Sequence, residues 1–270
     1  MIRLRSLGLI SLVAVGLMGA ATLTDVTDAQ AAPPAAKGPK PPPAVKEPIR
    51  LTPEGLRFGM ASNEVVDFYS KVLDQDYVAI YKVTPVGPKM KQVDAALADQ
   101  KSAFPRSEVT FGALPTGIDN TPLRGEYNYN NNETMMSITR QGVTRYFFFA
   151  SKRLWKIYDA VPLKAESELG GTYKDAIAAL TKRFNVAGRV LAEDAAAGRN
   201  MTEVDWADTS THVRAIDRSG ENILGLVYEE KGTAERMAAY KASHKDNSGA
   251  IDPAIAAATT GTRNDDPNGS

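Results

Sequence analysis

The side chains that could carry acid–base or metal chemistry are few in this sequence. It has two histidines, His212 and His244, and no cysteine. A Ser–His–acid triad needs a histidine beside an activated serine, and no G-x-S-x-G motif is present. Zinc would need three or four nitrogen, sulfur or carboxylate ligands. We therefore predict no catalytic residue and no metal site, and interpret His212 as an exposed or half-buried strand residue.

Three aspartates, Asp205, Asp208 and Asp217, follow one another closely enough to suggest a carboxylate site. Calcium loops follow a D-x-D-x-D-G spacing, of which 217–222 (DRSGEN) has only part. A turn with solvated charges is the simpler interpretation. Motifs for phosphate or dinucleotide binding are also absent from the sequence, so we predict no cofactor. A hydrolase that works through carboxylates stays open as an alternative, because its acids can come from distant positions.

The aromatic segment 144–160 (TRYFFFASKRLWKIYDA) is a candidate binding site in a chain that is only 7% aromatic. Neighbouring residues of a strand point to opposite faces, and Ser151-Lys152 is the expected turn. The pairs expected across this turn are Phe149–Leu154, Phe148–Trp155 and Phe147–Lys156. If one face covers helices, the other still carries a patch of Tyr146, Phe148 and Trp155. The other half of the chain could bury this patch, a partner protein could bind it, or a small molecule could stack on it.

Hydrophobic spacing predicts the elements that position these residues. A period of 3.6 indicates helices in 55–77, 89–104, 170–185 and about 233–244, with Thr172 and Asp175 as an approximate capping box. A period of two predicts strands in 123–130, 133–140, 142–150, 153–163, 202–208, 211–217 and 222–230. Tight turns between strands favour antiparallel meanders. We predict an α+β fold with helices packed on an antiparallel meander sheet.

The segments Gly59–Leu73 and Gly170–Phe184 share one pattern. In both, small residues lead into a polar triplet that ends in an acid, and the same apolar spacing follows. This pattern suggests two related helix-plus-meander halves. Any two amphipathic helices could show the same spacing by chance, so both explanations stay open.

The sequence Gly59-Met60-Ala61-Ser62-Asn63-Glu64-Val65 resembles the G-M-s-x-x-E-V helix entry of small envelope α+β modules. These modules are the SmpA/OmlA outer-membrane assembly lipoproteins and the two-domain β-lactamase-inhibitor-like proteins. The segment YFFFASKRLWKIY is similar to their aromatic strand, short turn and second strand. The resemblance implies a non-catalytic protein that binds other proteins through an exposed sheet face. The cysteine that anchors such lipoproteins is absent here.

The N-terminus reads as a bacterial export signal over 1–31. Arg3 and Arg5 precede an apolar run, 7–23, and an A-x-A cleavage pattern ends at Ala31. The apolar run lies near the lower limit of about 17 residues for a membrane span, so an uncleaved anchor is the alternative. We expect a periplasmic or secreted protein with no stable membrane span after cleavage and, lacking cysteine, no lipid anchor.

The remaining divisions follow from composition. The expected regions are a proline-rich linker at 32–50, a helix-helix-four-strand half at 51–165, a helix-three-strand half with a closing helix at 166–245, and a disordered tail at 246–270. Lys plus Arg equals Asp plus Glu at 32 each, so net charge gives no reason to expect nucleic acid as a partner. We expect a non-catalytic module that binds a protein or another envelope component.

Overall fold

The computed structural model describes residues 40–112, 116–121, 123, 125–194 and 199–243. The expected signal segment, the linker as far as residue 39, His244 and the expected tail lie outside these residues. The chain divides into two units, Met1–Lys40 and Pro41–Ser270, and the elements below all belong to the second unit.

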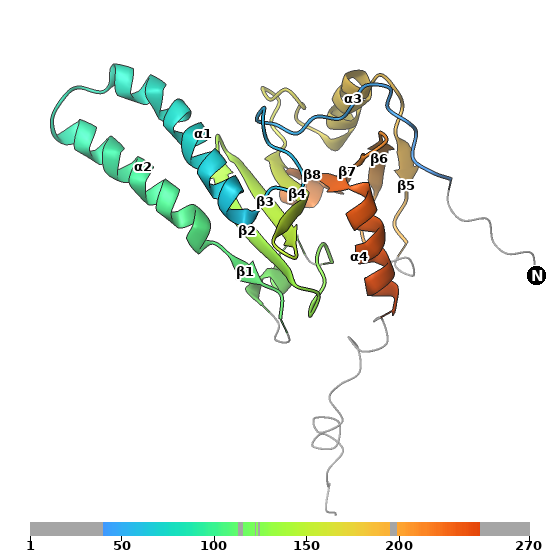
Figure 1. Ribbon diagram of the computed structural model, residues 1–270. Helices are drawn as coiled ribbons and strands as arrows, with labels where there is room; N and C mark the ends of the chain where they lie inside the picture. Colours follow the sequence, from blue (N-terminus) through green and yellow to red (C-terminus); the bar gives the residue numbers. More distant parts are fainter. Residues whose placement is uncertain (1–39, 113–115, 122, 124, 195–198, 244–270) are drawn as a thin grey trace, which may run out of the picture. The chain divides into compact units, whose positions relative to one another are not determined.

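Within the described residues, four α-helices accompany eight strands that form one sheet (Figure 1). The helices are α1 (Ser62–Val83), α2 (Pro88–Arg106), α3 (Tyr173–Phe184) and α4 (Lys231–Ser243). The strands are β1 (Val109–Thr110), β2 (Glu133–Arg140), β3 (Val143–Ala150), β4 (Arg153–Pro162), β5 (Arg189–Leu191), β6 (Glu203–Ala207), β7 (Thr211–Arg218) and β8 (Ile223–Glu230). Their order is β1-β2-β3-β4-β8-β7-β6-β5, and neighbouring strands are antiparallel. The α+β fold with a meander sheet is therefore confirmed. No helix in the described part of the chain is both long and apolar enough to span a membrane.

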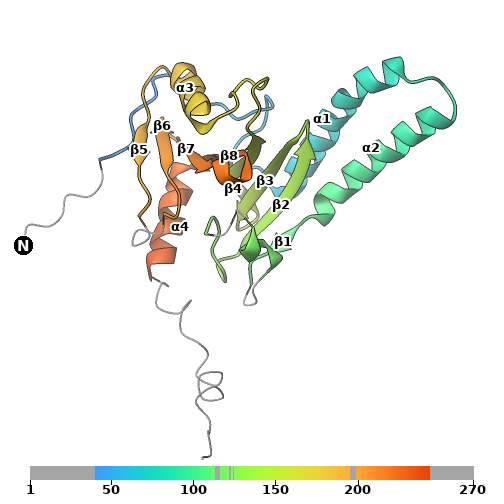
Figure 2. The ribbon, with the colours of Figure 1, turned by 180° about the vertical axis from the view of Figure 1, so that it is seen from behind.

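The two faces of the sheet have different covers (Figures 1 and 2). Helices α1 and α2 pack on β2–β4 through one hydrophobic cluster, and α3 packs on β6–β8 through a second. We call this side the helix face. The opposite side, the cavity face, is covered by α4 and by the segment between β1 and β2, whose Phe111, Leu123 and Tyr127 join a third cluster. Both sides of the sheet are therefore largely buried.

The meander β2–β4 lies where its alternating pattern predicts it. The turn residues Gln141 and Gly142 have φ of 52° and 80°, and Ser151 and Lys152 have φ of 48° and 63°. Two successive residues with positive φ fit the right-handed twist of the strands that they connect. Thr172 also caps α3 as predicted, since its Oγ1 accepts a hydrogen bond from the backbone N–H of Asp175 at 3.1 Å.

The predicted strand over 123–130 is wrong. Its described residues form turns, and β1 holds the edge of the sheet beside β2 instead. The Tyr127 ring stacks on Phe111 with centroids 3.9 Å apart, and Tyr129 meets both rings edge to face. Two tyrosines spaced like strand residues therefore pack into one cluster, because the segment crosses the cavity face instead of joining the sheet.

Part of the predicted linker is docked on the sheet. The backbone N–H of Val45 donates to the carbonyl of Ala207 at 2.7 Å, and the N–H of Ala207 donates to the carbonyl of Pro43 at 3.2 Å. This stretch of the proline-rich region expected to be a linker is therefore paired with a strand of the sheet. The cause is an open edge: β5 pairs with β6 only as far as Asp205, which leaves Ala207 available for pairing.

The two predicted halves meet at the centre of the one sheet. Their last strands, β4 and β8, are neighbours, and β3-β2 and β7-β6 extend outward on the two sides. Gly59 and Gly170, with φ of 82° and 80°, each lie two residues before the N-cap of α1 or α3. This arrangement agrees with two related halves, and the duplication stays a hypothesis.

Close packing beside Gly225 gives a first prediction. A Cβ at this position would lie 2.4 Å from the hydroxyl of Tyr158 and 3.3 Å from Cβ of Ile216. We expect Gly225→Ala to lower the free energy of unfolding by about 1–3 kcal/mol, because the core must shift to admit the methyl group. Denaturant unfolding measures this loss.

The Tyr158 hydroxyl provides the control. It is buried without a hydrogen-bond partner among the described residues, so Tyr158→Phe alone should change stability by less than about 1 kcal/mol. In the Gly225→Ala background the same change should recover about half of the loss. Strictly additive effects would show that the clash with this hydroxyl is not the cause.

Candidate functional site

A β-bulge in β4 brings Lys156 to the cavity face. Phe148 pairs with Lys156 and Phe149 with Leu154, so Trp155 is the extra residue on this strand. The predicted pair Phe149–Leu154 is therefore confirmed, while Phe148–Trp155 and Phe147–Lys156 are wrong as register pairs. A bulge places two successive side chains on the same side of a strand. The Lys156 ammonium accordingly lies over the rings of both Phe148 and Trp155, 4.8 and 4.6 Å from their centroids.

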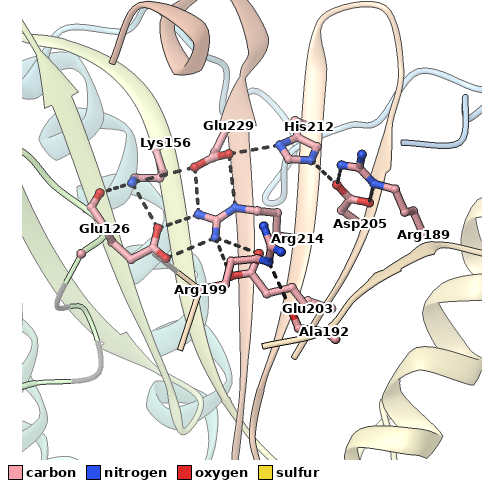
Figure 3. Close-up of polar contacts among 12 residues, drawn as sticks. Glu126, Lys156, Arg189, Ala192, Arg199, Glu203, Asp205, His212, Arg214 and Glu229 are labelled. Carbon is pink, nitrogen blue, oxygen red and sulfur yellow. Dashed lines mark hydrogen bonds and ion pairs between the residues drawn. The ribbon is translucent and has the colours of Figure 1, made fainter. Parts of the chain in front are cut away.

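Cross-strand pairing places charged residues in two rows on this face (Figure 3). In the first row, Lys156 of β4 is opposite Glu229 of β8, which is opposite His212 of β7. In the second row, Arg214 of β7 is opposite Asp205 of β6, which is opposite Arg189 of β5. We call these six residues, with Glu126 and Glu203, the charged network. Opposite charges thus meet at neighbouring positions, which is the favourable arrangement in a sheet.

Arg214 is the centre of the charged network. Its guanidinium reaches Glu126 at 2.6 Å, Glu229 at 3.0 Å and Glu203 at 3.3 Å. Lys156, whose side chain is 3% exposed, donates to the backbone carbonyl of Glu126 and lies 3.2 Å from the carboxylate of the same residue. Glu126 comes from the segment that crosses the cavity face, so these contacts tie that segment to β4 and β7.

His212 connects the two rows. Its Nδ1 lies 3.2 Å from Glu229 and its Nε2 lies 3.0 Å from Asp205. Asp205 is fully buried and also accepts from Arg189 at 2.9 Å. Burial alone would lower the pKa of His212, but the hydrogen bonds with Asp205 and Glu229 raise it above its ordinary value. His212 is therefore a half-buried strand residue whose imidazole holds its proton more strongly than a free one.

The carboxylates of the charged network have opposite pKa shifts. Burial raises the pKa of Glu203 above the ordinary value, because the attraction of Arg214 is too weak to offset it. For Glu229, burial would also raise the pKa, but Arg214, His212 and Lys156 together hold it far below the ordinary range. Arg214 and Lys156 lower the pKa of Glu126 in the same way. Glu229 and Glu126 are therefore firmly ionised, whereas Glu203 holds its proton more readily.

A cavity of about 630 Å³ lies above the charged network. Its floor is formed by β4, β7 and β8, and its walls include Glu126, Arg199, Met201 and Ala238 of α4. Charged, polar and apolar groups all line it, with Trp155 and Met237 among the apolar ones. A cavity of this size and mixed lining can hold a small polar molecule or a few side chains of a partner.

A second, larger cavity of about 1000 Å³ lies on the helix face, beside the docked segment 44–53. Its charged centre is Arg145, which bonds Asp159 at 2.6 Å and the hydroxyl of Tyr69 at 2.8 Å. It also donates to the carbonyl of Thr52. These contacts hold the docked segment on the sheet, so we assign this group to the fold.

The aromatic patch expected from the sequence is mostly inside the protein. Phe148 and Trp155 are 0% and 4% exposed, and Tyr146 is half-buried. Tyr146 meets Tyr158 edge to face at 6.0 Å. Partner binding by these three residues stays a prediction, and only Tyr146 offers appreciable surface for it in this structure.

The three aspartates have separate roles. Asp205 belongs to the charged network, and Asp208 accepts from the backbone N–H groups of Ser210 and Thr211 in the β6–β7 turn. Asp217 accepts from the backbone N–H of Ser219 at 3.0 Å. The last two therefore shape turns, as the simpler interpretation had it. Within the described ranges, no group of three or more His, Asp or Glu side chains could hold a metal ion.

Most of the charged network was missed at the sequence level. A signal exists in retrospect: β6 alternates acids at Glu203 and Asp205, while β7 alternates basic groups at His212 and Arg214. In the observed register Arg214 faces Asp205, a pairing that the two alternations by themselves do not specify. Alternation along β4 could not have placed Lys156, because the bulge moves its side chain to the cavity face of the sheet.

The fold and the site define an α+β protein with one meander sheet and a paired-charge cavity on the side opposite α1, α2 and α3. No family model matches the chain, and no curated protein or solved structure matches it either. The resemblance to envelope modules therefore remains an expectation from the sequence.

The raised pKa of His212 gives a second prediction. A group whose pKa is higher in the folded state stabilises the fold below its unfolded pKa of about 6.5 and loses that contribution as pH rises through the folded value. We expect the free energy of unfolding to fall as pH rises from about 6.5 through the raised pKa of folded His212, with a slope of at most about 1.4 kcal/mol per pH unit. His212→Gln should remove this slope. An unchanged slope in this variant would assign the pH dependence to another group.

Proposed function

We propose that this chain is an exported, non-catalytic α+β module that binds a protein or another component of the bacterial envelope. The cavity above the charged network is the binding site. Export is supported by the three-part signal pattern over 1–31 and the binding role by the resemblance of 59–65 to envelope modules. Export and the binding role are thus proposed from the sequence, whereas the cavity is proposed as the binding site from the structure.

The observation that carries the proposal is the mutual pairing of the charges that form the cavity floor. Lys156, Arg214 and Glu229 hold one another in fixed positions across three strands. Side chains that are already ordered lose little conformational entropy when a ligand arrives, so a fixed polar surface favours specific binding. A ligand with both positive and negative groups, such as a peptide segment, would find partners of both signs there.

The same pairing disfavours a catalytic role for most of these groups. A general base needs a pKa near the working pH and access to the proton that it removes. Glu126 and Glu229 are held ionised by cations and are therefore weak bases. Both ring nitrogens of His212 already have carboxylate partners. A fixed recognition surface fits these properties better than a reactive one.

A matched pair of substitutions on α4 tests the cavity. Ala238 lines it, whereas the next residue, Ala239, is exposed and does not line it. Envelope extract is first separated into protein, lipid and glycan fractions, and each fraction is incubated with the chain. The fraction that the chain retains is then titrated to measure its binding. We expect Ala238→Trp to weaken binding at least about tenfold by filling the site. Ala239→Trp should bind like the unchanged chain. Equal binding by all three would refute the cavity as the site.

The export claim has its own test. Intact mass of the chain from the periplasmic or secreted fraction should show an N-terminus near Ala32. A full-length chain in the cytosol would contradict export, and a full-length chain in the membrane fraction would favour the uncleaved anchor.

One observation keeps the carboxylate hydrolase as a second candidate. Glu203 and Glu229 share Arg214 at one cavity yet have opposite pKa shifts, and such a divided pair can supply a general acid and an ionised carboxylate that acts as a nucleophile or stabilises positive charge. Glu203→Gln separates the two functions. Loss of a hydrolytic activity on envelope glycans or peptides would favour the hydrolase, while unchanged ligand binding without any activity in the parent chain would favour the binding module.

A further inference from the structure

The far end of the α1–α2 hairpin has exposed apolar side chains that the fold does not use. The last buried residue of α1 is Leu73, and the only buried residue of α2 among those described is Phe104, near its C-terminal end. At 1.5 Å per residue, α1 continues roughly 15 Å beyond Leu73. Figure 1 shows the two helices running side by side to a connection that lies away from the strands. This end of the hairpin therefore adds nothing to the core.

The end of α1 and the turn that follows it carry the two most exposed large apolar residues described. Val83 is 81% exposed and Val86 is 93% exposed, and Val78 and Ile80 follow at 47% and 43% on α1. Soluble proteins tolerate single exposed apolar side chains, but a group at a projecting turn marks an interaction site. Pro85 and Pro88 stiffen the turn, which keeps the two valines at its outer end.

The charges around this turn have one sign. Lys82, Lys89 and Lys91 are all exposed, and the sequence has no acidic residue between Asp76 and Asp94. Both of these aspartates are engaged, Asp76 with Arg140 and Asp94 with the hydroxyl of Tyr81. The turn thus combines an apolar tip with a basic collar, which is complementary to a surface that is apolar inside and anionic outside.

We propose that this hairpin tip binds an anionic lipid surface by inserting Val83 and Val86 among the lipids while its lysines contact phosphate head groups. Size favours lipid over a folded protein partner. A stable protein interface uses about 20–30 residues on each side, far more than the short segment 82–91 offers. Insertion at a lipid interface needs only a few apolar side chains together with basic ones. The tip would hold the chain at a membrane without spanning it, independently of the cavity.

A tryptophan at the tip tests this proposal in the full chain. Both native tryptophans, Trp155 and Trp206, are buried, so Val86→Trp adds a reporter at a position where its environment can change. The probe is a vesicle of phosphatidylcholine with or without phosphatidylglycerol. We expect the fluorescence of Val86→Trp to shift to the blue, relative to the native tryptophan signal, with the anionic vesicles and much less with the neutral ones. The local readout matters because the apolar N-terminal segment could itself bind vesicles.

Charge variants in the Val86→Trp background complete the test. Each lysine near an anionic surface strengthens binding about fivefold, so replacing Lys82, Lys89 and Lys91 by glutamine should weaken the response at least about tenfold. The matched control replaces Lys164, Lys174 and Lys182, exposed lysines near α3, and should leave the response unchanged. No shift with anionic vesicles, or an equal loss in the control, would overturn the proposal. A shift produced only by an envelope protein fraction would also overturn it.

Discussion

Arg214→Met is expected to lower the free energy of unfolding by about 3–5 kcal/mol, because it leaves buried carboxylates without their cation. Glu126, Glu203 and Glu229 all bond this guanidinium, and their side chains are between 9% and 13% exposed. Lys156 can offset only part of the lost charge, since it lies 3.2 Å from Glu126 and 3.9 Å from Glu229. Chemical denaturation at neutral pH measures the loss.

Arg218→Met is the matched control for this prediction. Arg218 lies on the same strand and bonds Glu221 at 2.7 Å, but Glu221 is 43% exposed and can return to water. Its replacement should cost no more than about 1 kcal/mol. Adding Glu126→Gln and Glu203→Gln to Arg214→Met should recover at least half of the loss, because neutral amides are less costly to bury than unpaired carboxylates. Similar losses for Arg214→Met and Arg218→Met would contradict the central role of Arg214.

Phe147→Ala is expected to lower the free energy of unfolding by about 3–5 kcal/mol, because the smaller side chain leaves a cavity in the core. Phe147 is fully buried on the helix face, with its ring centroid 5.0 Å from that of Tyr69 and 5.5 Å from that of Phe104. With Phe149, it is one of the two β3 residues in the hydrophobic cluster that joins the hairpin α1–α2 to the sheet. Thermal and denaturant unfolding should both show the loss.

The neighbour of Phe147 supplies the contrast. Tyr146 points to the other face and is half-buried, so Tyr146→Ala should cost less, about 1–2 kcal/mol. The comparison also bears on the aromatic patch. If Tyr146→Ala leaves the fold intact but weakens binding of an envelope ligand, the patch expected from the sequence contributes to recognition. Equal losses of stability at 146 and 147 would show that the two faces are equally buried around β3.

Local pattern was enough to predict most of the elements. Strands β2, β3 and β4 are rich in apolar and aromatic residues, and their turns contain Gln141-Gly142 and Ser151-Lys152, which adopt positive φ. Helix α3 begins where Thr172 caps it. These features depend on side chains within a few residues of one another, so the sequence displays them directly.

The charged network required information that no local pattern contains. Lys156 reaches the cavity face because of one extra residue in β4, and Glu126 reaches it because 125–130 crosses the sheet instead of extending it. Both depend on which strands pair and with what register. The alternation of Tyr127 and Tyr129 was therefore misleading, since an aromatic cluster stabilises a turn segment as readily as a strand.

The sequence by itself determined the α+β class, the strands from β2 to β4 and from β6 to β8, and the cap of α3, because each depends on hydrophobic period and turn chemistry along a short stretch of chain. Only the tertiary structure decided that the two halves share one sheet, that residues 43–49 dock at its edge, and that Lys156, Arg214 and Glu229 meet above a cavity. These outcomes rest on hydrogen bonds and burial between residues far apart in the chain. Register is fixed by the sum of many such contacts, so a single bulge can move a charge from one face to the other.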